Sequence, residues 1–228
     1  MDNVLVVVAH PDDEVLGCGG SIAKWTKKGI SVNILIMAEG ETSRDLTRTE
    51  EKKALAISFL KKSAHKAGKI LGVNSVNLLG LPDNRMDSLN RLDVIKEVEK
   101  EINRLQPDTV ITHHAGDVNI DHRIVHEAVV TACRPKPYQP VKRLLACEIQ
   151  SSTEWQTPGS NHIFQPNWFE DVSQTIGLKI DALNAYETEV RKWPHPRSLK
   201  NVENTAKWRG SSVGYDAAEA FMLLREIR

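Results

Sequence analysis

Short runs of apolar residues alternate along this chain with longer segments in which apolar residues recur every three or four positions. The short runs are typical of buried strands, and the longer spacing is typical of amphipathic helices. The pattern predicts strands at 4–9, 32–38, 76–79, 109–112 and 144–149. It predicts a first helix that ends at Lys28 before a capping Gly29, and a long second helix within 42–71. Further helices are predicted over 90–105, 122–132, 176–190 and 217–225.

Alternating strands and helices are typical of an α/β fold. We therefore expect a Rossmann-like open sheet that is mainly parallel, with right-handed crossovers and helices on both faces. The chain is predicted to form a single domain over 1–228. Residues 1–134 make its Rossmann-like core, and 135–228, with the polar and irregular stretch 191–215, form a C-terminal part that sets substrate specificity.

Polar residues cluster directly after four of the predicted strands. In parallel sheets ligands bind outside the carboxyl ends of the strands, so these clusters should meet at one edge. The four clusters are HPDDE at 10–14, EGETSR at 39–44, DNRMD at 83–87 and HHAGDVNIDH at 113–122.

The first and last clusters contain metal-binding side chains. His10 and Asp13 suit zinc or a similar divalent ion, and His122 and His126 can share one face of a helix. A His–Asp pair with one more His gives three ligands and leaves a position open, which is typical of catalytic zinc. Spacing alone does not choose between His122 and His126. The pair is not HExxH, because Arg123 stands where that motif has Glu.

Composition narrows the classes of partner. The chain has 228 residues, with 30 Lys and Arg against 30 Asp and Glu, so no basic surplus indicates nucleic acid. No apolar stretch approaches the ~18 residues that span a bilayer, and the start does not read as a signal peptide. Three cysteines without a CxxC pattern suit a reducing compartment. We expect a cytoplasmic protein.

The segments AHPDDEVLGCGG and GDVNIDHRIVHEAV together resemble the PIG-L/LmbE-like deacetylases, and GETSR, DNRMD and WPHPRS resemble its bacterial branch. The resemblance implies a zinc-dependent hydrolase that removes acetyl from an N-acetylglucosamine-type amino sugar or its conjugate. It also implies a small-molecule substrate, one Zn²⁺ per chain and a homo-oligomer. Iron(II), cobalt or manganese would also fit such a ligand set.

Position by position, the resemblance implies that His10, Asp13 and His122 are the metal ligands. It makes Asp12 the general base that activates the metal-bound water. Many relatives have a His where this chain has Asn119, and an amide there can still donate a hydrogen bond to an oxyanion.

An amide cannot supply a proton to the leaving amine, and His195 is the candidate for that role. Substrate contacts are predicted for Arg44, Arg85 and Asp121.

Three alternatives remain open. The glycines of GCGGS are the only support for a nucleotide-binding module, and they do not follow the strand as that fingerprint requires. A non-catalytic relative would retain the fold and bind a ligand. An amidohydrolase with another acyl group would use the same centre.

Overall fold

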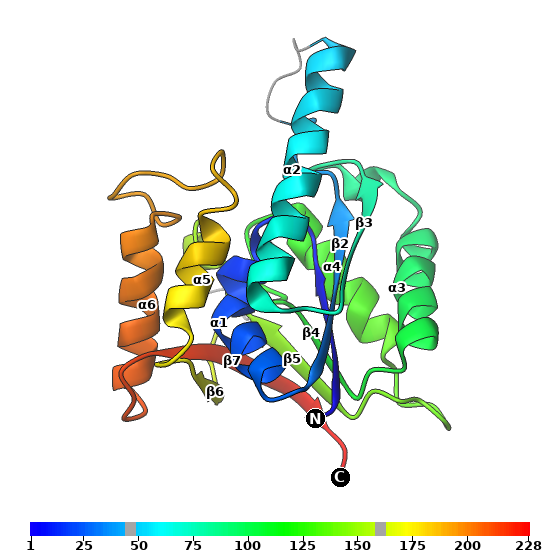
Figure 1. The fold of residues 1–228 in the computed structure, drawn as a ribbon. Helices are drawn as coiled ribbons and strands as arrows, with labels where there is room; N and C mark the ends of the chain where they lie inside the picture. Colours follow the sequence, from blue (N-terminus) through cyan, green and yellow to red (C-terminus); the bar gives the residue numbers. More distant parts are fainter. Residues whose placement is uncertain (44–48, 158–162) are drawn as a thin grey trace.

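The computed structural model describes residues 1–43, 49–157 and 163–228 (Figure 1). Within them, one seven-stranded sheet has the order β3-β2-β1-β4-β5-β7-β6. The first five strands are parallel, and β7 and β6 join antiparallel at one edge. The strands are β1 (Asn3–Val8), β2 (Ser31–Ala38), β3 (Ser75–Leu81), β4 (Thr109–His113), β5 (Arg143–Cys147), β6 (Trp168–Asp171) and β7 (Ala218–Glu226).

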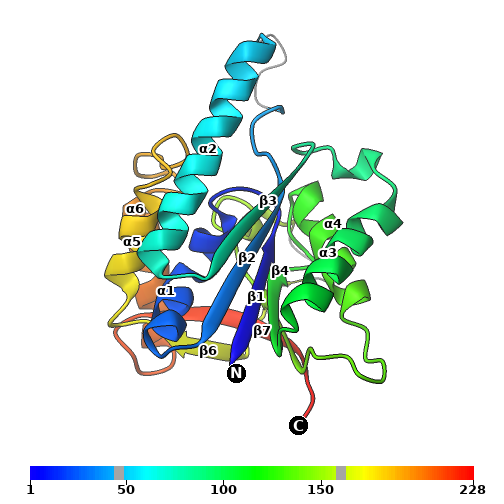
Figure 2. The same cartoon turned by 45° about the vertical axis from the view of Figure 1, so that its right-hand side comes forward.

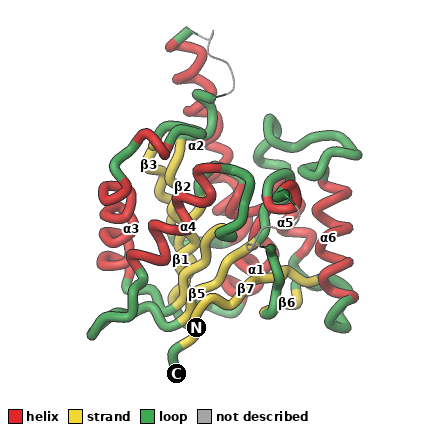
Figure 3. Tube along the Cα trace, turned by 180° about the vertical axis from the view of Figure 1, so that it is seen from behind, coloured by secondary structure: helices red, strands yellow, loops and turns green. Residues whose placement is uncertain are grey.

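Helices cover both faces of the sheet (Figures 1 and 2). α3 and α4 lie on one face, while α1, α2, α5 and α6 lie on the other side. The tube in Figure 3 shows the same layers from behind. The helices are α1 (Asp13–Lys27), α2 (Glu50–Leu71), α3 (Arg91–Leu105), α4 (Ile120–Ala132), α5 (Ile176–Leu183) and α6 (Leu199–Ser211).

The unbroken apolar run of β1 is explained by its position in the sheet. Val4, Val6 and Val8 belong to the apolar cluster under α1, α2 and α5, while Leu5 and Val7 belong to the cluster under α3 and α4. Successive strand residues point to opposite faces, so a strand covered on both faces is apolar throughout. The predicted fold class, a mainly parallel α/β sheet, is confirmed.

The order places a topological switch point between β1 and β4, which are neighbours in the sheet although β2 and β3 follow β1 in sequence. Ligands of open α/β sheets bind in the crevice at such a point. The loops that follow β1 and β4 carry the sequence-predicted metal ligands.

The C-terminal part corrects three predictions. Residues 217–225 were expected to form a helix, but Ala218–Glu226 is β7, paired with both β5 and β6. The irregular stretch 191–215 contains α6, which begins at the capping residue Ser198. The helix predicted over 176–190 ends at Leu183.

α6 buries Val202, Ala206 and Gly210, which lie four residues apart on one face, so the cap and this spacing were the available signals.

Among the described residues no helix is both long and apolar enough to cross a membrane. The three cysteines, Cys18, Cys133 and Cys147, are free and buried. Burial raises the pKa of the Cys133 thiol to about 12, so it stays protonated at neutral pH. Its environment is that of a packing residue.

Candidate metal centre

The turn after β1 carries His10, Asp12 and Asp13. The Asp13 N–H donates to the His10 carbonyl at 3.2 Å, and the Asp13 carboxylate accepts from the His10 N–H at 2.8 Å. Asp12 occupies the N-cap of α1 with a φ of 113°. Such a conformation costs a non-glycine residue roughly 1–3 kcal/mol and is concentrated at functional sites. The buried Asp12 lines a cavity of about 350 Å³.

Three side-chain atoms from two loops converge at this cavity. Nδ1 of His10 lies 3.2 Å from Nε2 of His122, and Oδ2 of Asp13 lies 3.4 Å and 3.3 Å from those two nitrogens. His122 is presented by the first turn of α4, where the Asn119 side chain accepts from the N–H groups of Asp121 and His122. The structure thus brings the three predicted ligands together.

The triangle has the size that a tetrahedral zinc site requires. Zinc bonds to His nitrogen and carboxylate oxygen are about 2.0–2.1 Å long, and two ligands of a tetrahedron are separated by about 1.6 bond lengths, or roughly 3.3 Å. The observed separations of 3.2, 3.3 and 3.4 Å match this value. Three protein ligands also leave one position open, as in catalytic sites.

Aspartates hold the outer nitrogen of each histidine. His10 Nε2 lies 3.2 Å from carboxylate oxygens of both Asp83 and Asp121, and His122 Nδ1 lies 3.1 Å from Asp117. A carboxylate at this position fixes the tautomer and orientation of a metal-binding imidazole. Sequence reasoning did not assign Asp117 or Asp83 to this task.

Asp117 also connects the centre to the loop after β5. The hydroxyl of Thr153 donates to its carboxylate at 2.7 Å, and the hydroxyl of Ser152 donates to the other carboxylate oxygen. The N–H of Asn119 donates to it as well, at 2.8 Å. Loops after two neighbouring strands therefore hold His122.

The His113 ring stacks on His122 with centroids 3.9 Å apart. Burial, together with the neighbouring His122, lowers the pKa of His113 to about 3, so this ring is neutral and accepts from the Ala9 N–H at 2.8 Å. For His122, burial acts in the lowering direction. The carboxylates of Asp13 and Asp117 outweigh it and raise the His122 pKa to about 9.

Asp12 lines this cavity but is neither part of the triangle nor, unlike Asp83, a partner of one of its histidines. Burial raises its pKa, and the charges of Asp13 and Glu189 raise it further, while Arg197 acts in the opposite direction. The Arg197 guanidinium lies 3.4 Å from Asp12 and 3.3 Å from Glu189. A strongly shifted carboxyl group in a cleft is characteristic of functional sites.

The other predicted residues are distributed as follows. Asn119 lines the cavity, and its side-chain amide donates to Oδ1 of the Asn84 side chain at 3.0 Å, which leaves one amide hydrogen for a ligand. His195 is not among the described residues that line it, and its Nδ1 accepts from the Arg197 N–H at 3.0 Å. Arg85 is exposed and does not line the cavity either.

Arg44 lies outside the described residues. Asp121 is fully buried, and besides facing His10 its carboxylate accepts from the N–H groups of Asn84 and Met86 at 2.7 and 3.1 Å. This burial does not favour the predicted substrate contact and gives Asp121 a supporting role under His10 instead. His126, the alternative ligand, donates from Nδ1 to the His113 carbonyl at 2.8 Å.

The glycines of GCGGS are explained by packing within α1. A Cβ added at Gly17 would lie 2.6 Å from the Cys147 sulfur, and one at Gly20 would lie 3.0 Å from the Val172 side chain. These glycines let α1 approach β5 and the residue that follows β6 closely. They are buried and do not form a phosphate-binding loop.

Comparison with known proteins identifies the family of the chain. Residues 5–133 match the model of a family described as PIG-L, GlcNAc-PI de-N-acetylase. YaiS of Escherichia coli K12, an uncharacterized deacetylase, is 31% identical over 193 residues, covering 81% of this chain and 90% of that protein. A probable N-acetyl-alpha-D-glucosaminyl L-malate deacetylase 2 of Bacillus subtilis is 26% identical over 190 residues, 82% of this chain and 83% of its own length.

Among solved structures, the N,N'-diacetylchitobiose deacetylase from Pyrococcus horikoshii superposes with a TM-score of 0.79 at 20% identity. The match covers 98% of this chain and 84% of that one. At this level of identity the likeness shows a shared fold.

Proposed function

The chain belongs to the PIG-L family, whose model covers more than half of its length, and we propose that it removes the acetyl group from an N-acetylglucosamine-type amino sugar or conjugate with zinc at His10, Asp13 and His122. The observation that carries this proposal is the 3.2–3.4 Å triangle of their donor atoms. Relatives named as deacetylases of N-acetyl sugars support the same substrate class.

When bound, zinc supplies Lewis acidity, which polarises a carbonyl oxygen and lowers the pKa of water. The chain's own residues do the rest. Asp12 accepts the proton of the attacking water as the new C–O bond forms at the acetyl carbon. The C–N bond then breaks, the nitrogen takes up a proton, and acetate and a free amine leave.

Other side chains orient Asp12 and stabilise the negative charge that develops on the acetyl oxygen. The remaining N–H of the Asn119 amide is a donor for the oxygen that becomes negative during attack. Arg197, between Asp12 and Glu189, holds the Asp12 carboxylate in the cavity wall. We also propose His195 as the donor to the leaving amine, which is supported by the hydrogen bond that its Nδ1 accepts from the backbone N–H of Arg197.

The test measures acetate release and zinc content together. Zinc-loaded wild type should release acetate from at least one of N-acetylglucosamine, N,N'-diacetylchitobiose and N-acetylglucosaminyl malate. Asp12→Asn, which keeps the shape of the side chain, should bind one zinc per chain and lose about 10²–10⁴-fold in kcat, as expected for loss of a general base.

A matched control is Asp87→Asn, which changes an exposed carboxylate in the short 3-10 helix Met86–Ser88 after β3. It should leave kcat unchanged. Full activity of Asp12→Asn would remove Asp12 as the base, and wild type that holds zinc yet releases acetate from none of the three compounds would contradict the proposed substrate class.

A further inference from the structure

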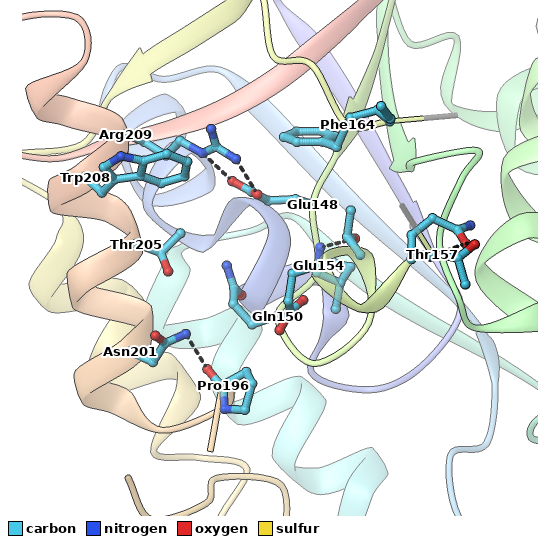
Figure 4. A pocket seen from close by; sticks show the side chains of 14 residues that line it. Glu148, Gln150, Glu154, Thr157, Phe164, Pro196, Asn201, Thr205, Trp208 and Arg209 are labelled. Atoms are coloured by element: carbon cyan, nitrogen blue, oxygen red, sulfur yellow. Dashed lines mark hydrogen bonds and ion pairs between the residues drawn. The ribbon is translucent and has the colours of Figure 1, made fainter. Parts of the chain in front are cut away.

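A second cavity of about 560 Å³ adjoins the candidate metal centre. The two cavities share the lining residues Ile149 and Gln150, which follow β5. Figure 4 shows that this cavity is bounded by the loop after β5 on one side and by α6 on the other. Its volume lies within the range of small-molecule sites, about 300–1,000 Å³. A group attached to a sugar in the first cavity can therefore extend into the second.

Gln150 carries an unsatisfied polar atom at the junction. Its side chain is only 8% exposed, and its Oε1 is buried with no hydrogen-bond partner among the described residues. A buried amide oxygen without a donor costs roughly 1–3 kcal/mol, so such atoms call for an explanation. If the Gln150 side chain turns its amide oxygen toward the junction, a ligand hydroxyl there can donate to it.

The charged side chains Arg209, Glu148 and Glu154 that line the second cavity already have partners within the protein. Arg209 makes a bidentate ion pair with Glu148, with N–O distances of 2.8 and 2.7 Å. The Glu154 carboxylate accepts from the N–H groups of Ser151 and Ser152. Among the described residues that line the cavity, Arg209 is the one cationic residue. The described part of the lining therefore offers no unpaired cation to a carboxylate or a phosphate.

The remaining lining suits a flat hydroxylated ring. Trp208 on α6 is 61% exposed, and Phe164 lies across the Glu148–Arg209 pair from it (Figure 4). The Arg209 guanidinium lies over the Trp208 ring, 4.1 Å from its centroid, so the opposite face of this indole is the one that can cover the C–H face of a pyranose. Asn201 and Thr205, two turns and one turn before Trp208 on α6, offer an amide and a hydroxyl to the ring's edge.

We propose that this second cavity is the subsite for an uncharged second sugar linked to the N-acetylated unit, and that Gln150 is its specificity-determining residue. The inference rests on the proposed function for the identity of the first unit. It predicts that the enzyme prefers a neutral disaccharide to a conjugate with an anionic group.

The experiment compares kcat/KM for N-acetylglucosamine, N,N'-diacetylchitobiose and N-acetylglucosaminyl malate. Wild type should favour the disaccharide over both other compounds by about tenfold or more. Gln150→Leu and Trp208→Ala should each reduce the ratio of disaccharide to monosaccharide by about 5- to 100-fold, as loss of a buried hydrogen bond or a stacking face implies. Tyr215→Ala, which removes an aromatic side chain of 53% exposure that lines neither cavity, should leave the ratio unchanged.

Binding separates this inference from the proposed function. The Kd of N,N'-diacetylchitobiose for zinc-loaded Asp12→Asn should rise when Gln150→Leu is added, whether or not acetate is released. If this Kd does not change, or if both variants lower the monosaccharide and disaccharide reactions equally, the second-sugar subsite is wrong while the deacetylase function stands. A preference for the malate conjugate would equally overturn it. Tight disaccharide binding without acetate release from any compound would retain the subsite and remove the proposed reaction.

Discussion

Each histidine of the candidate metal centre depends on a carboxylate behind it. For His122 this carboxylate is Asp117, which lies 3.1 Å from its Nδ1 and is itself held by the hydroxyls of Ser152 and Thr153. We expect Asp117→Asn to weaken zinc binding by about 10- to 100-fold, because the imidazole loses both orientation and basicity. Competition for zinc with a chromophoric chelator measures this directly.

The control is again Asp87→Asn, whose carboxylate is exposed and lies in the 3-10 helix after β3. An Asp117 variant with wild-type zinc affinity would show that the ion does not use His122. If the variant retains its zinc affinity but loses activity, Asp117 does not support His122 as a zinc ligand, because a change in the orientation of a ligand must affect zinc binding first.

The sequence reveals the residues that form a local pattern more readily than those that support them. His10, Asp12 and Asp13 lie in one turn, so their proximity is fixed by the chain itself. Asp117 and Asp83 reach the histidines only because β3, β4 and β1 end at the same edge of the sheet. An isolated aspartate in a loop gives no signal of such a contact, although both of them follow predicted strands closely.

At the scale of elements, α1 packs closely on β5 because Gly17 has no side chain. A Cβ there would lie 2.6 Å from the Cys147 sulfur and 3.0 Å from Ile149, so Gly17→Ala forces a shift in a tight core. We expect it to lower the free energy of unfolding by about 1–3 kcal/mol despite the better helix propensity of alanine. Urea denaturation followed by circular dichroism gives the value.

Gly177, in α5, is the matched control, because a Cβ added to it meets no atom within 4 Å. Gly177→Ala should raise stability by up to about 1 kcal/mol through helix propensity alone. Equal effects of the two substitutions would show that packing at Gly17 does not limit the approach of α1.

Asp108 connects the start of β4 to the start of β1. Its carboxylate accepts from the N–H groups of Asp2 and Asn3 at 2.6 and 3.1 Å and from the Thr109 hydroxyl at 2.6 Å. Partial burial acts to raise the pKa of Asp108, but these hydrogen bonds outweigh it and hold the pKa below its ordinary value. A depressed carboxylate pKa contributes stability above the unfolded-state pKa of about 3.9, and this contribution is lost as pH falls through the lower folded-state pKa.

Because solvent screens this partly exposed carboxylate, Asp108→Asn should cost only about 0.5–1 kcal/mol at pH 7, and the gap to wild type should close as pH falls below about 4. Thermal or urea unfolding of both proteins across pH 3–7 tests the sign. Asp181→Asn, an exposed site on α5, should follow wild type throughout. A gap that widens on acidification would contradict the pKa direction.

Two C-terminal elements show why pattern reasoning failed there. The segment Ala218–Glu226 is rich in Ala, Leu, Met and Glu, residues that favour helices, yet it pairs with β5 on one side and β6 on the other. Pairing partners distant in sequence override local propensity, and strand propensity depends strongly on context. The sequence pattern did not predict α6, because most of its surface is polar and only a narrow apolar stripe faces the protein.

At the scale of the whole molecule, one buried ion pair joins the N-terminal core to the C-terminal part. The Lys179 ammonium of α5 lies 2.6 Å from the Glu219 carboxylate of β7 and donates to the Leu16 carbonyl of α1 at 2.8 Å. Glu219 also accepts from the N–H groups of Gly20 and Ser21. Both charged side chains are about 95% or more buried, so each compensates the other in a medium of low polarity.

Lys179→Met removes the cation and leaves Glu219 buried without a counter-charge, which should cost about 3–5 kcal/mol. Because α1, α5 and β7 meet at this pair, we expect far-ultraviolet circular dichroism and tryptophan fluorescence to report one coincident transition that moves to lower denaturant, as two-state unfolding requires. Adding Glu219→Gln removes the uncompensated charge and should restore part of the loss. Two separate transitions would contradict the prediction of a single domain over 1–228, since residues 135–228 would then unfold apart from the sheet that their strands complete.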